Sequence, residues 1–191
     1  MKILRLIVPI ALLSIPAFVI AQQGFQITPA MQAEIDRQKA VVAGWAADPT
    51  VVSAVREQNA RGPLPGMDNP RWKVTRRSDP LVKGFQGNAA GRFLRSRLEA
   101  AGGTFSEAFL SASRGEKVAF VEKTTSYVHV GSAKFDVPFG TGKSWQGKPE
   151  FDESSQTYAV QVAVPILADG KTIGVLVAGI NLSHLEKVAR K

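Results

Sequence analysis

The pattern of apolar positions changes its period near the middle of the chain. In the first half, apolar residues recur at spacings of three, four and seven, as they do along one face of an α helix. One such stripe consists of Met31, Ile35, Val42 and Trp45. We therefore expect a long helix over 28–47, because Thr28 is a good N-cap and Pro29 suits the first helical position.

Further helices are expected before the period changes. Asp48 can cap a second helix that ends near residue 60. The segment 61–70 contains three prolines and two glycines, which predicts a loop. A helix then restarts at Asp79-Pro80 and runs to about residue 101. Glycines interrupt its first half, so we expect a short helix followed by a firmer one that starts at Asn88.

Beyond Gly103 the period becomes two, which is typical of strands. We expect strands at Phe105–Ala112, Lys117–Lys123, Tyr158–Ile166 and Thr172–Ile180. The last two are joined by a turn that contains Asp-Gly, a strong hairpin signal.

The rest of the second half is expected to contain little regular structure. Segment 124–156 should be irregular, with short extended pieces at Tyr127–Val130 and Lys134–Pro138. Ser183 can cap a last helix, His184–Arg190. Helices followed by an antiparallel sheet predict an α+β fold.

The first 21 residues read as an export signal. Lys2 and Arg5 form a basic start, an apolar run follows, and Val19 and Ala21 are small enough for the positions before a signal-peptidase cut. We therefore expect cleavage after Ala21, a mature domain over 22–191 and a periplasmic location. The alternative is an uncleaved anchor, although the run is short for a membrane span and carries two prolines.

Composition and charge narrow the function classes. The chain has no cysteine, which excludes disulfides, thiolate metal sites and cysteine nucleophiles, and it has only two histidines. Its net charge of +8 is typical of proteins that bind nucleic acid, an anionic membrane surface or an acidic ligand. Because an exported protein rarely meets nucleic acid, we expect no nucleic-acid partner.

The second half resembles a known family of sensors. Its hairpin at Ser106–Lys123, its Trp-Gly region near Trp145, and its last two strands, VQVAVPILADG and KTIGVLVAGIN, follow the pattern of single Cache domains, the PAS-like extracellular sensor modules also called PDC domains. The resemblance covers Ser106–Asn181, and the long helix over 28–47 matches the family's N-terminal helix. It implies an α+β, PAS-like fold with that helix packed on a central antiparallel sheet.

The resemblance also implies a ligand site. In this family a small ligand lies between the sheet and the loop that precedes the fourth strand, which corresponds here to Thr124–Ser155. The candidate ligand-binding residues in that loop are Tyr127, His129, Lys134 and Trp145. Aromatic rings supply apolar surface, while cations and imidazole suit a carboxylate, so we expect a small organic acid or a similar polar or anionic ligand. The alternative is that these are ordinary loop residues.

Strand parity adds two candidates. In the strand Tyr158–Ile166 the valines face one way, towards the expected core, so Gln161 faces the other way. Ser111 shares a face with Phe105 and Phe109 by the same count, and is a small candidate lining residue. The alternative for Gln161 is a solvent-facing strand residue.

The sequence offers little for catalysis. Glu150, Asp152 and Glu153 form an acidic cluster, but their spacing matches no calcium loop and a turn is the simpler interpretation. The segment GTGKS at 140–144 lacks the first glycine of a phosphate-binding loop, because Val137 occupies that position. We therefore expect a protein that is not an enzyme and that needs no cofactor and no metal.

The function predicted from these features is an exported ligand-binding sensor domain. It would report to a membrane sensor kinase or chemoreceptor as its partner. A ligand-free periplasmic interaction module that forms a homodimer is the alternative. The basic segment RWKVTRR, 71–77, is suited either to lipid headgroups or an acidic partner, or simply to a solvated connector, which is the simpler interpretation.

Overall fold

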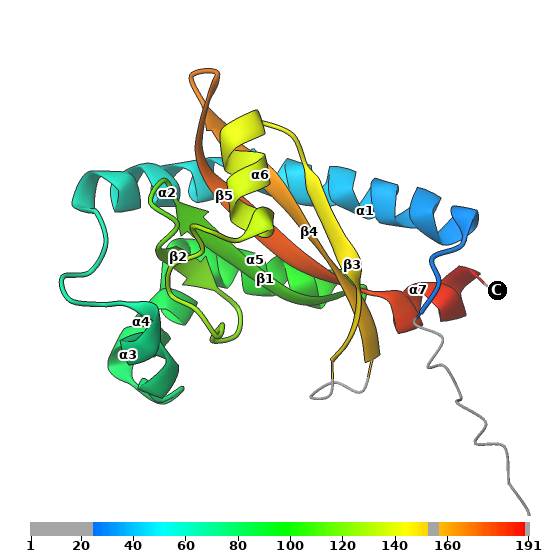
Figure 1. Cartoon of the computed structure of the whole chain (residues 1–191), viewed down its shortest axis with the longest axis horizontal. Helices are drawn as coiled ribbons and strands as arrows, with labels where there is room; N and C mark the ends of the chain where they lie inside the picture. Colours follow the sequence, from blue (N-terminus) through cyan, green and yellow to red (C-terminus); the bar gives the residue numbers. More distant parts are fainter. Residues whose placement is uncertain (1–24, 153–156, 190–191) are drawn as a thin grey trace, which may run out of the picture.

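A computed structural model describes residues 25–152 and 157–189 and shows helices packed on one antiparallel sheet (Figure 1). The helices are α1 (Pro29–Ala46), α2 (Pro49–Arg61), α3 (Asn69–Val74), α4 (Pro80–Gly87), α5 (Ala89–Ala100), α6 (Ala133–Thr141) and α7 (Leu182–Ala189). The strands are β1 (Phe105–Ala112), β2 (Lys117–Phe120), β3 (Trp145–Asp152), β4 (Thr157–Ala168) and β5 (Lys171–Asn181). The expected leader, 1–21, lies outside the described residues.

The sheet has the strand order β2-β1-β5-β4-β3, and each neighbouring pair is antiparallel. The predicted α+β class is therefore confirmed. The expected hairpin β4–β5 is present, with Asp169 and Gly170 both at positive φ in its turn. Among the described residues, no helix is both long and apolar enough to cross a bilayer.

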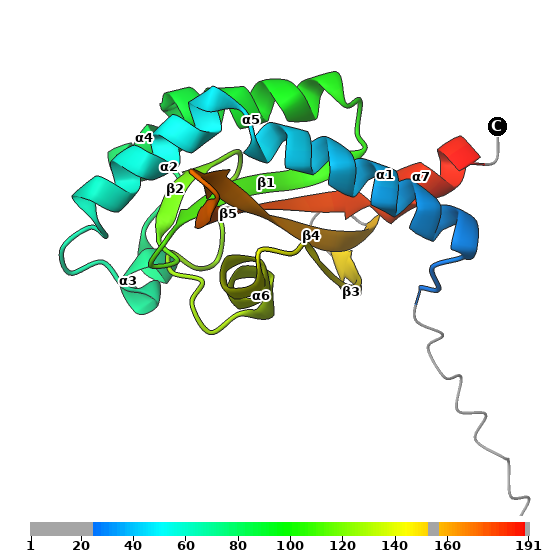
Figure 2. The ribbon, with the colours of Figure 1, turned by 90° about the horizontal axis from the view of Figure 1, so that it is seen from above.

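Helices α1, α2 and α5 cover one face of the sheet, while α3 and α6 lie on the other side (Figure 2). The larger core fills the space under α1, α2 and α5. There Ile35 of α1 and Leu94 of α5 are fully buried, α1 over β4 and β5 and α5 over β1 and β2, in one core that also contains Val162. The prediction that the valine side of β4 faces the helices is confirmed.

A second, smaller core lies on the opposite face and is rich in aromatic rings. Its members include Trp72, Phe109, Phe120, Tyr127 and Phe135. Trp72 anchors α3 there, because its ring packs 5.8 Å from that of Phe120 and its Nε1 donates to the carbonyl of Thr124 at 2.8 Å. The sheet is thus covered by a helical layer on one face and by an aromatic layer, flanked by a cleft, on the other.

The first helices begin at the N-cap residues that the sequence predicted. Thr28 accepts a hydrogen bond from the Met31 amide at 3.2 Å, and Asp48 accepts one from the Thr50 amide at 2.9 Å. The break at Asn88 is also confirmed, since its Oδ1 accepts from the Gly91 amide at 2.7 Å and caps α5. The loop after α2 is shorter than expected, because Asp68 caps α3 from Asn69 onward.

Three expectations for the second half were wrong. The piece Lys134–Pro138 is helical, because Phe135, Pro138 and Phe139 lie at helical spacing and pack on the aromatic core. Strand β3 was missed because Gly147 and Pro149 break the alternation, which an edge strand with a bulge tolerates.

The third concerns the start of the last helix. Helix α7 begins at Leu182, and its first turn is capped by Asn181, whose Oδ1 accepts from the His184 amide at 3.0 Å. Ser183, the expected cap, instead accepts a hydrogen bond from the amide of Tyr158.

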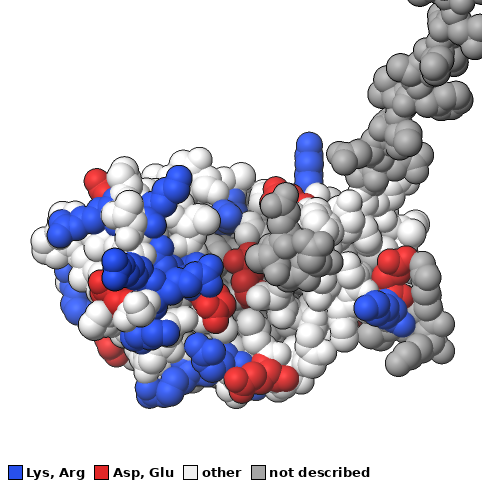
Figure 3. All heavy atoms as spheres, turned by 90° about the horizontal axis from the view of Figure 1, so that it is seen from below, with Lys and Arg blue, Asp and Glu red and all other residues white. Residues whose placement is uncertain are grey.

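The surface charge is uneven along the molecule. Viewed from below, Lys and Arg side chains gather on the left, over the end where α3 and α4 lie (Figure 3). Much of this charge comes from the segment 71–83, the predicted basic stretch and its continuation into α4.

Candidate functional site

The site is built on the face of the sheet that α1, α2 and α5 leave uncovered. Two rows of side chains cross the strands there. In one row, Glu107 of β1 and Gln161 of β4 both pair with Gly179 of β5. In the next row, Phe109, Val177, Ala163 and Trp145 follow one another from β1 to β3. The first row is polar and the second is apolar.

A chain of hydrogen bonds links α6 to the polar row. The ammonium of Lys134 on α6 donates to Oε1 of Gln161 at 2.9 Å. The amide nitrogen of Gln161 then donates to Oε1 of Glu107 at 2.6 Å. Gly179 lies between Glu107 and Gln161 without a side chain, so the two can meet across it. These hydrogen bonds therefore connect α6 with residues on both sides of the central strand, β5.

A lysine lies on the floor of this face with no polar partner. Lys117 of β2 is fully buried, and its Nζ makes no hydrogen bond with any described residue. The Nζ instead lies 3.2 Å from the centroid of the Phe109 ring. Burial lowers the pKa of this ammonium well below its usual value, attraction to Glu107 opposes that change, and repulsion by Lys134 adds to it.

Three other buried polar groups near the hairpin β1–β2 also have an atom without a partner. They are Ser111 Oγ, Glu116 Oε1 and His129 Nδ1. Ser111 is the direct cross-strand neighbour of Lys117, and the backbone of Glu116 bridges to Val128, beside His129. Nearly all buried polar atoms in proteins are paired, so this group of unpaired atoms is unusual for a protein interior.

His129 is held neutral by its surroundings. Its ring lies 4.9 Å from that of Phe109, and its side chain is buried. Burial, followed by repulsion from Lys117 and Lys134, lowers the pKa of His129 to about 2. The imidazole is therefore uncharged at physiological pH, and a neutral ring offers one donor and one acceptor.

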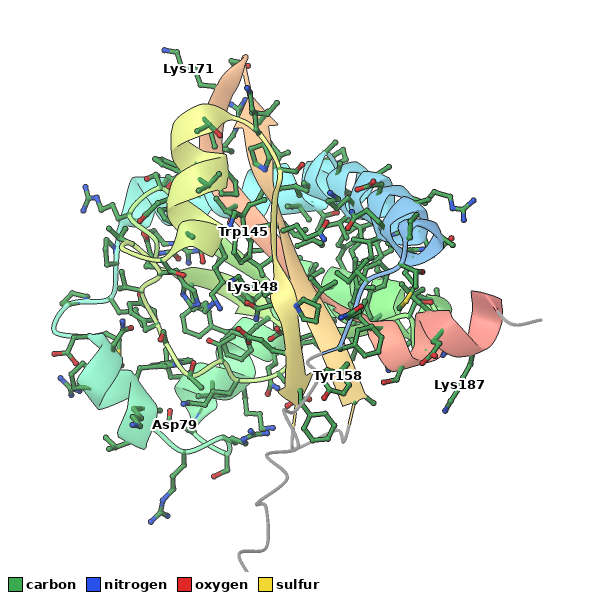
Figure 4. The ribbon with its side chains drawn as sticks, turned by 45° about the vertical axis from the view of Figure 1, so that its right-hand side comes forward. Asp79, Trp145, Lys148, Tyr158, Lys171 and Lys187 are labelled. Atoms are coloured by element: carbon green, nitrogen blue, oxygen red, sulfur yellow. The ribbon has the colours of Figure 1, made fainter. Side chains whose placement is uncertain are left out.

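A cleft of about 770 Å³ opens above this floor. Phe109, His129, Lys134, Trp145 and Gln161 line its inner part. Its rim carries charges of both signs from the segment after β2, the segment between α3 and α4, and strand β3: Arg77, Glu122, Lys123, Lys148 and Glu150. Figure 4 shows Trp145 and Lys148 along β3, with Trp145 beside α6.

Most of the predicted site residues come together at this cleft. His129, Lys134, Trp145 and Gln161 line it. Ser111 is buried beside Lys117 and does not line the cleft. Ser111 shares a face with Phe109, as the parity count predicted. Phe105, however, does not, since a bulge between Phe105 and Glu107 turns its ring to the helical face, 4.7 Å from Trp45.

Tyr127 is placed apart from the other candidates. It is fully buried in the aromatic core, 5.7 Å from the ring of Trp72, and its hydroxyl accepts a hydrogen bond from the amide of Leu64 at 2.9 Å. Tyr127 does not line the cleft. Its hydrogen bond instead holds the loop 62–68 against the second core.

The sequence reasoning missed Lys117 and Glu107. The register of the hairpin could have found Lys117, because a turn over 113–116 brings it next to the strand that carries Ser111. Glu107 could not be placed by parity, because the bulge after Phe105 changes the count by one.

The described residues contain no group of three metal-ligating side chains. Within the acidic cluster considered above, Glu150 lies on the rim of the cleft, and Glu153 falls outside the described residues.

Comparisons with known proteins identify the class of fold. No family model and no curated protein matches the chain. The structure is similar to the ligand-binding domain of the Pseudomonas aeruginosa amino acid chemoreceptor PctC, solved in complex with GABA, with a TM-score of 0.53 and 12% identity. It is also similar to the sensor domain of Escherichia coli DcuS, with a TM-score of 0.52 and 12% identity.

The extent of these matches differs. The PctC match covers 83% of this chain and 58% of the PctC domain, so the chain spans a little over half of that domain. The DcuS match covers 84% of this chain and 97% of the DcuS domain. The fold is therefore that of Cache, or PDC-type, sensor domains, as the sequence pattern predicted.

Proposed function

We propose that this protein is a sensor domain that binds a small molecule with a carboxylate or a similar anionic group in the cleft over β1, β4 and β5. The observation that carries the proposal is the cation of Lys134, which lines the cleft together with His129 and is hydrogen-bonded to Gln161. Its ammonium can donate a charged hydrogen bond to an anionic group in the cleft, and Lys117 is buried beneath the same face of the sheet.

The energetics favour an anionic ligand over a neutral one. A buried ammonium without a partner is costly, because burial removes its hydration and nothing replaces it. A carboxylate that enters the cleft would favour the protonated form of Lys117 through its negative charge. Lys134 lines the cleft and supplies a cation to the ligand directly. A ligand with no negative charge would gain neither of these electrostatic attractions.

The remaining walls suit a small organic molecule. The cleft volume of about 770 Å³ lies within the usual range for small-ligand sites. Trp145 and Phe109 supply apolar surface, while the hydrogen-bonded pair Gln161 and Glu107 supplies fixed polar atoms. The complex of the similar PctC domain with GABA supports the same class of ligand, a small molecule that carries a carboxylate.

The hydrogen-bond chain offers a route for a response. Lys134 belongs to α6, so a ligand carboxylate that draws its ammonium away from Gln161 would pull on α6 and on β3 beside it. The resulting change of surface would be read by a membrane-bound kinase or chemoreceptor. The predicted export signal at 1–21 is consistent with this role in the periplasm.

The test is a binding screen with matched variants. Thermal shift and calorimetry would be run with acetate, succinate, malate, citrate and γ-aminobutyrate. Lys134→Met should weaken binding of any hit by roughly tenfold or more, because a charged hydrogen bond contributes about 1.5–3 kcal/mol. Trp145→Ala should weaken it by a similar factor, because the ligand loses apolar surface to pack on. Lys143→Met, which removes an exposed lysine outside the cleft, is the control.

Two results would contradict the proposal. One is that no carboxylate in the screen binds, while an uncharged analogue such as succinamide does. The other is that a carboxylate binds Lys134→Met and Trp145→Ala as tightly as it binds the unchanged protein, which would place the ligand elsewhere.

A further inference from the structure

A group of exposed cations outside the cleft is left unexplained by ligand binding. Arg71 and Lys73 on α3, Arg76 after it and Lys83 on α4 are all exposed, and we call these four residues the basic surface. They lie at the end of the molecule where Figure 3 shows Lys and Arg side chains gathered. None of the four lines the cleft described above.

The basic surface is poorly neutralised by its own protein. Within the part of the chain that the structure describes, Lys73, Arg76 and Lys83 form no ion pair. The nearby carboxylates of Asp68 and Asp79 are used as N-caps of α3 and α4, where each accepts a backbone hydrogen bond. Figure 4 labels Asp79 at this corner of the molecule.

An exposed apolar side chain lies among these cations. Val74, between Lys73 and Arg76, is 79% exposed, more than any other large apolar side chain described as exposed. Its neighbour Trp72 is fully buried and hydrogen-bonded to Thr124, so α3 is fixed with Val74 directed outward. The protein thus presents one exposed apolar side chain, with Lys73 and Arg76 close to it in the sequence, on a helix that is held in place by Trp72.

The shape of this region favours a flat partner over a narrow one. Helix α3 lies at the lower left of the molecule in Figure 1, at the end of the sheet near β2 and away from α1. A protein partner usually buries a broad patch with an apolar centre, and a single valine does not provide one. A bilayer surface accepts such a projection, because its headgroups take the cations and its interface takes the apolar side chain.

We propose that the basic surface docks the domain on an anionic lipid surface, with Val74 at the lipid interface and the four cations among the headgroup phosphates. Each cation near an anionic bilayer contributes ~1 kcal/mol, about fivefold in the binding constant. Lys123 at the border of the cleft would add to the attraction, whereas Arg77 there is already paired with Glu122 at 3.8 Å. This proposal does not depend on the ligand or on the proposed sensor function.

The experiment is vesicle co-sedimentation with the product purified from cells that express the full chain. Vesicles of phosphatidylcholine would be compared with vesicles that also contain phosphatidylglycerol. We expect binding to the anionic vesicles only, and a steep loss as salt is raised. The double variant Lys73→Gln/Arg76→Gln should weaken this binding by about fivefold per charge removed.

The matched control removes the same number of charges elsewhere. Lys171 at the tip of the β4–β5 hairpin and Lys187 on α7 are exposed and lie far from Asp79 in Figure 4. Lys171→Gln/Lys187→Gln should leave vesicle binding unchanged. Val74→Ser should weaken binding at high salt more than at low salt, because its contribution is not electrostatic.

Three outcomes would overturn the proposal. The first is equal binding to neutral and anionic vesicles, and the second is an equal loss in the control and test variants. The third is capture by soluble polyglutamate, sensitive to Lys73→Gln/Arg76→Gln, without binding to anionic vesicles. That result would show that the basic surface fits an acidic polypeptide instead of a membrane.

Discussion

The Nζ of Lys117 lies 3.2 Å from the centroid of the Phe109 ring and makes no hydrogen bond with any described residue. The ring face attracts the ammonium, but it does not replace the hydrogen bonds that the group makes in water. The protein therefore keeps a costly group in its floor, and such a cost is typical of a site that is shaped for a partner. Four predictions follow from this arrangement and its surroundings.

Lys117→Met should make the protein more stable and less able to bind its ligand. The substitution keeps an unbranched side chain of similar length and removes an unpaired buried amine, so we expect the free energy of unfolding to rise by about 1–3 kcal/mol. The gain should shrink as the pH rises towards 10.5, because the unfolded chain then also loses the proton from Lys117. Urea denaturation at several pH values measures both effects.

The control for that variant is Lys143→Met, which removes an exposed lysine and should leave stability nearly unchanged. A Lys117→Met protein that unfolds more easily than the unchanged protein would show that the ammonium contributes stability where it lies.

His129 should make the protein sensitive to mild acid. The folded pKa of about 2 is lower than the unfolded value of 6.5, so below pH 6.5 the unfolded chain binds a proton that the folded chain does not. Stability should then fall by about 1.4 kcal/mol for each pH unit below 6.5, and this contribution is fully present only above that pH. His129→Gln should show a smaller slope between pH 6 and pH 4 in urea denaturation. Parallel curves for the two proteins would contradict the prediction.

Gly179→Ala should disturb the polar row of the sheet. A Cβ at this position would lie 2.6 Å from Oγ of Ser106 and 2.8 Å from Cγ of Glu107, so Glu107 would have to move. We expect a loss of about 1–3 kcal/mol in the free energy of unfolding, and weaker ligand binding through the lost Glu107–Gln161 hydrogen bond. Gly44→Ala on α1, where a Cβ meets nothing within 4 Å, is the matched control.

Gly44, the control position, lies in a helix, so alanine there should raise the free energy of unfolding by up to about 1 kcal/mol. If Gly179→Ala were as stable as Gly44→Ala, the row would have room for a side chain, and the contact between Glu107 and Gln161 would not depend on the glycine.

Tyr127→Phe should affect stability and leave ligand binding unchanged. Its hydroxyl accepts the hydrogen bond from the Leu64 amide, and its ring packs in the aromatic core away from the cleft. Removing the hydroxyl should lower the free energy of unfolding by about 1 kcal/mol. Calorimetry with a ligand found in the carboxylate screen would measure the affinity. A clear loss of affinity at unchanged stability would return Tyr127 to the ligand site, where the sequence comparison had placed it.

Local signals in the sequence were sufficient for the elements whose cause is local. Thr28, Asp48 and Asn88 start helices because their side chains pair with amides only two or three residues away. The hairpin β4–β5 follows from Asp169-Gly170, and the facing of the valines in β4 follows from simple alternation. The Cache-type fold could therefore be predicted from pattern alone, and the structure confirms it.

Elements that depend on long-range packing were not predictable in this way. The apolar residues Phe135, Val137 and Phe139 alternate like those of a strand, yet α6 forms because Phe135 and Pro138 are buried on the aromatic core. Strand β3 exists because β4 offers it an edge, in spite of Gly147 and Pro149. In both places tertiary contacts outweigh a local preference.

The residues of the candidate site fall into the same two groups, those that local sequence signals predict and those that depend on long-range packing. The sequence by itself determined that aromatic and cationic residues such as Trp145 and Lys134 belong to the segment beside the sheet where a ligand was expected. It also determined that Gln161 faces away from the helical core. Only the tertiary structure decided that Lys117 is buried beside Ser111, that Glu107 reaches Gln161 across Gly179, and that Tyr127 belongs to a core. The physical reason is that strand register and one bulge fix which side chains meet, and residues far apart in the chain set both.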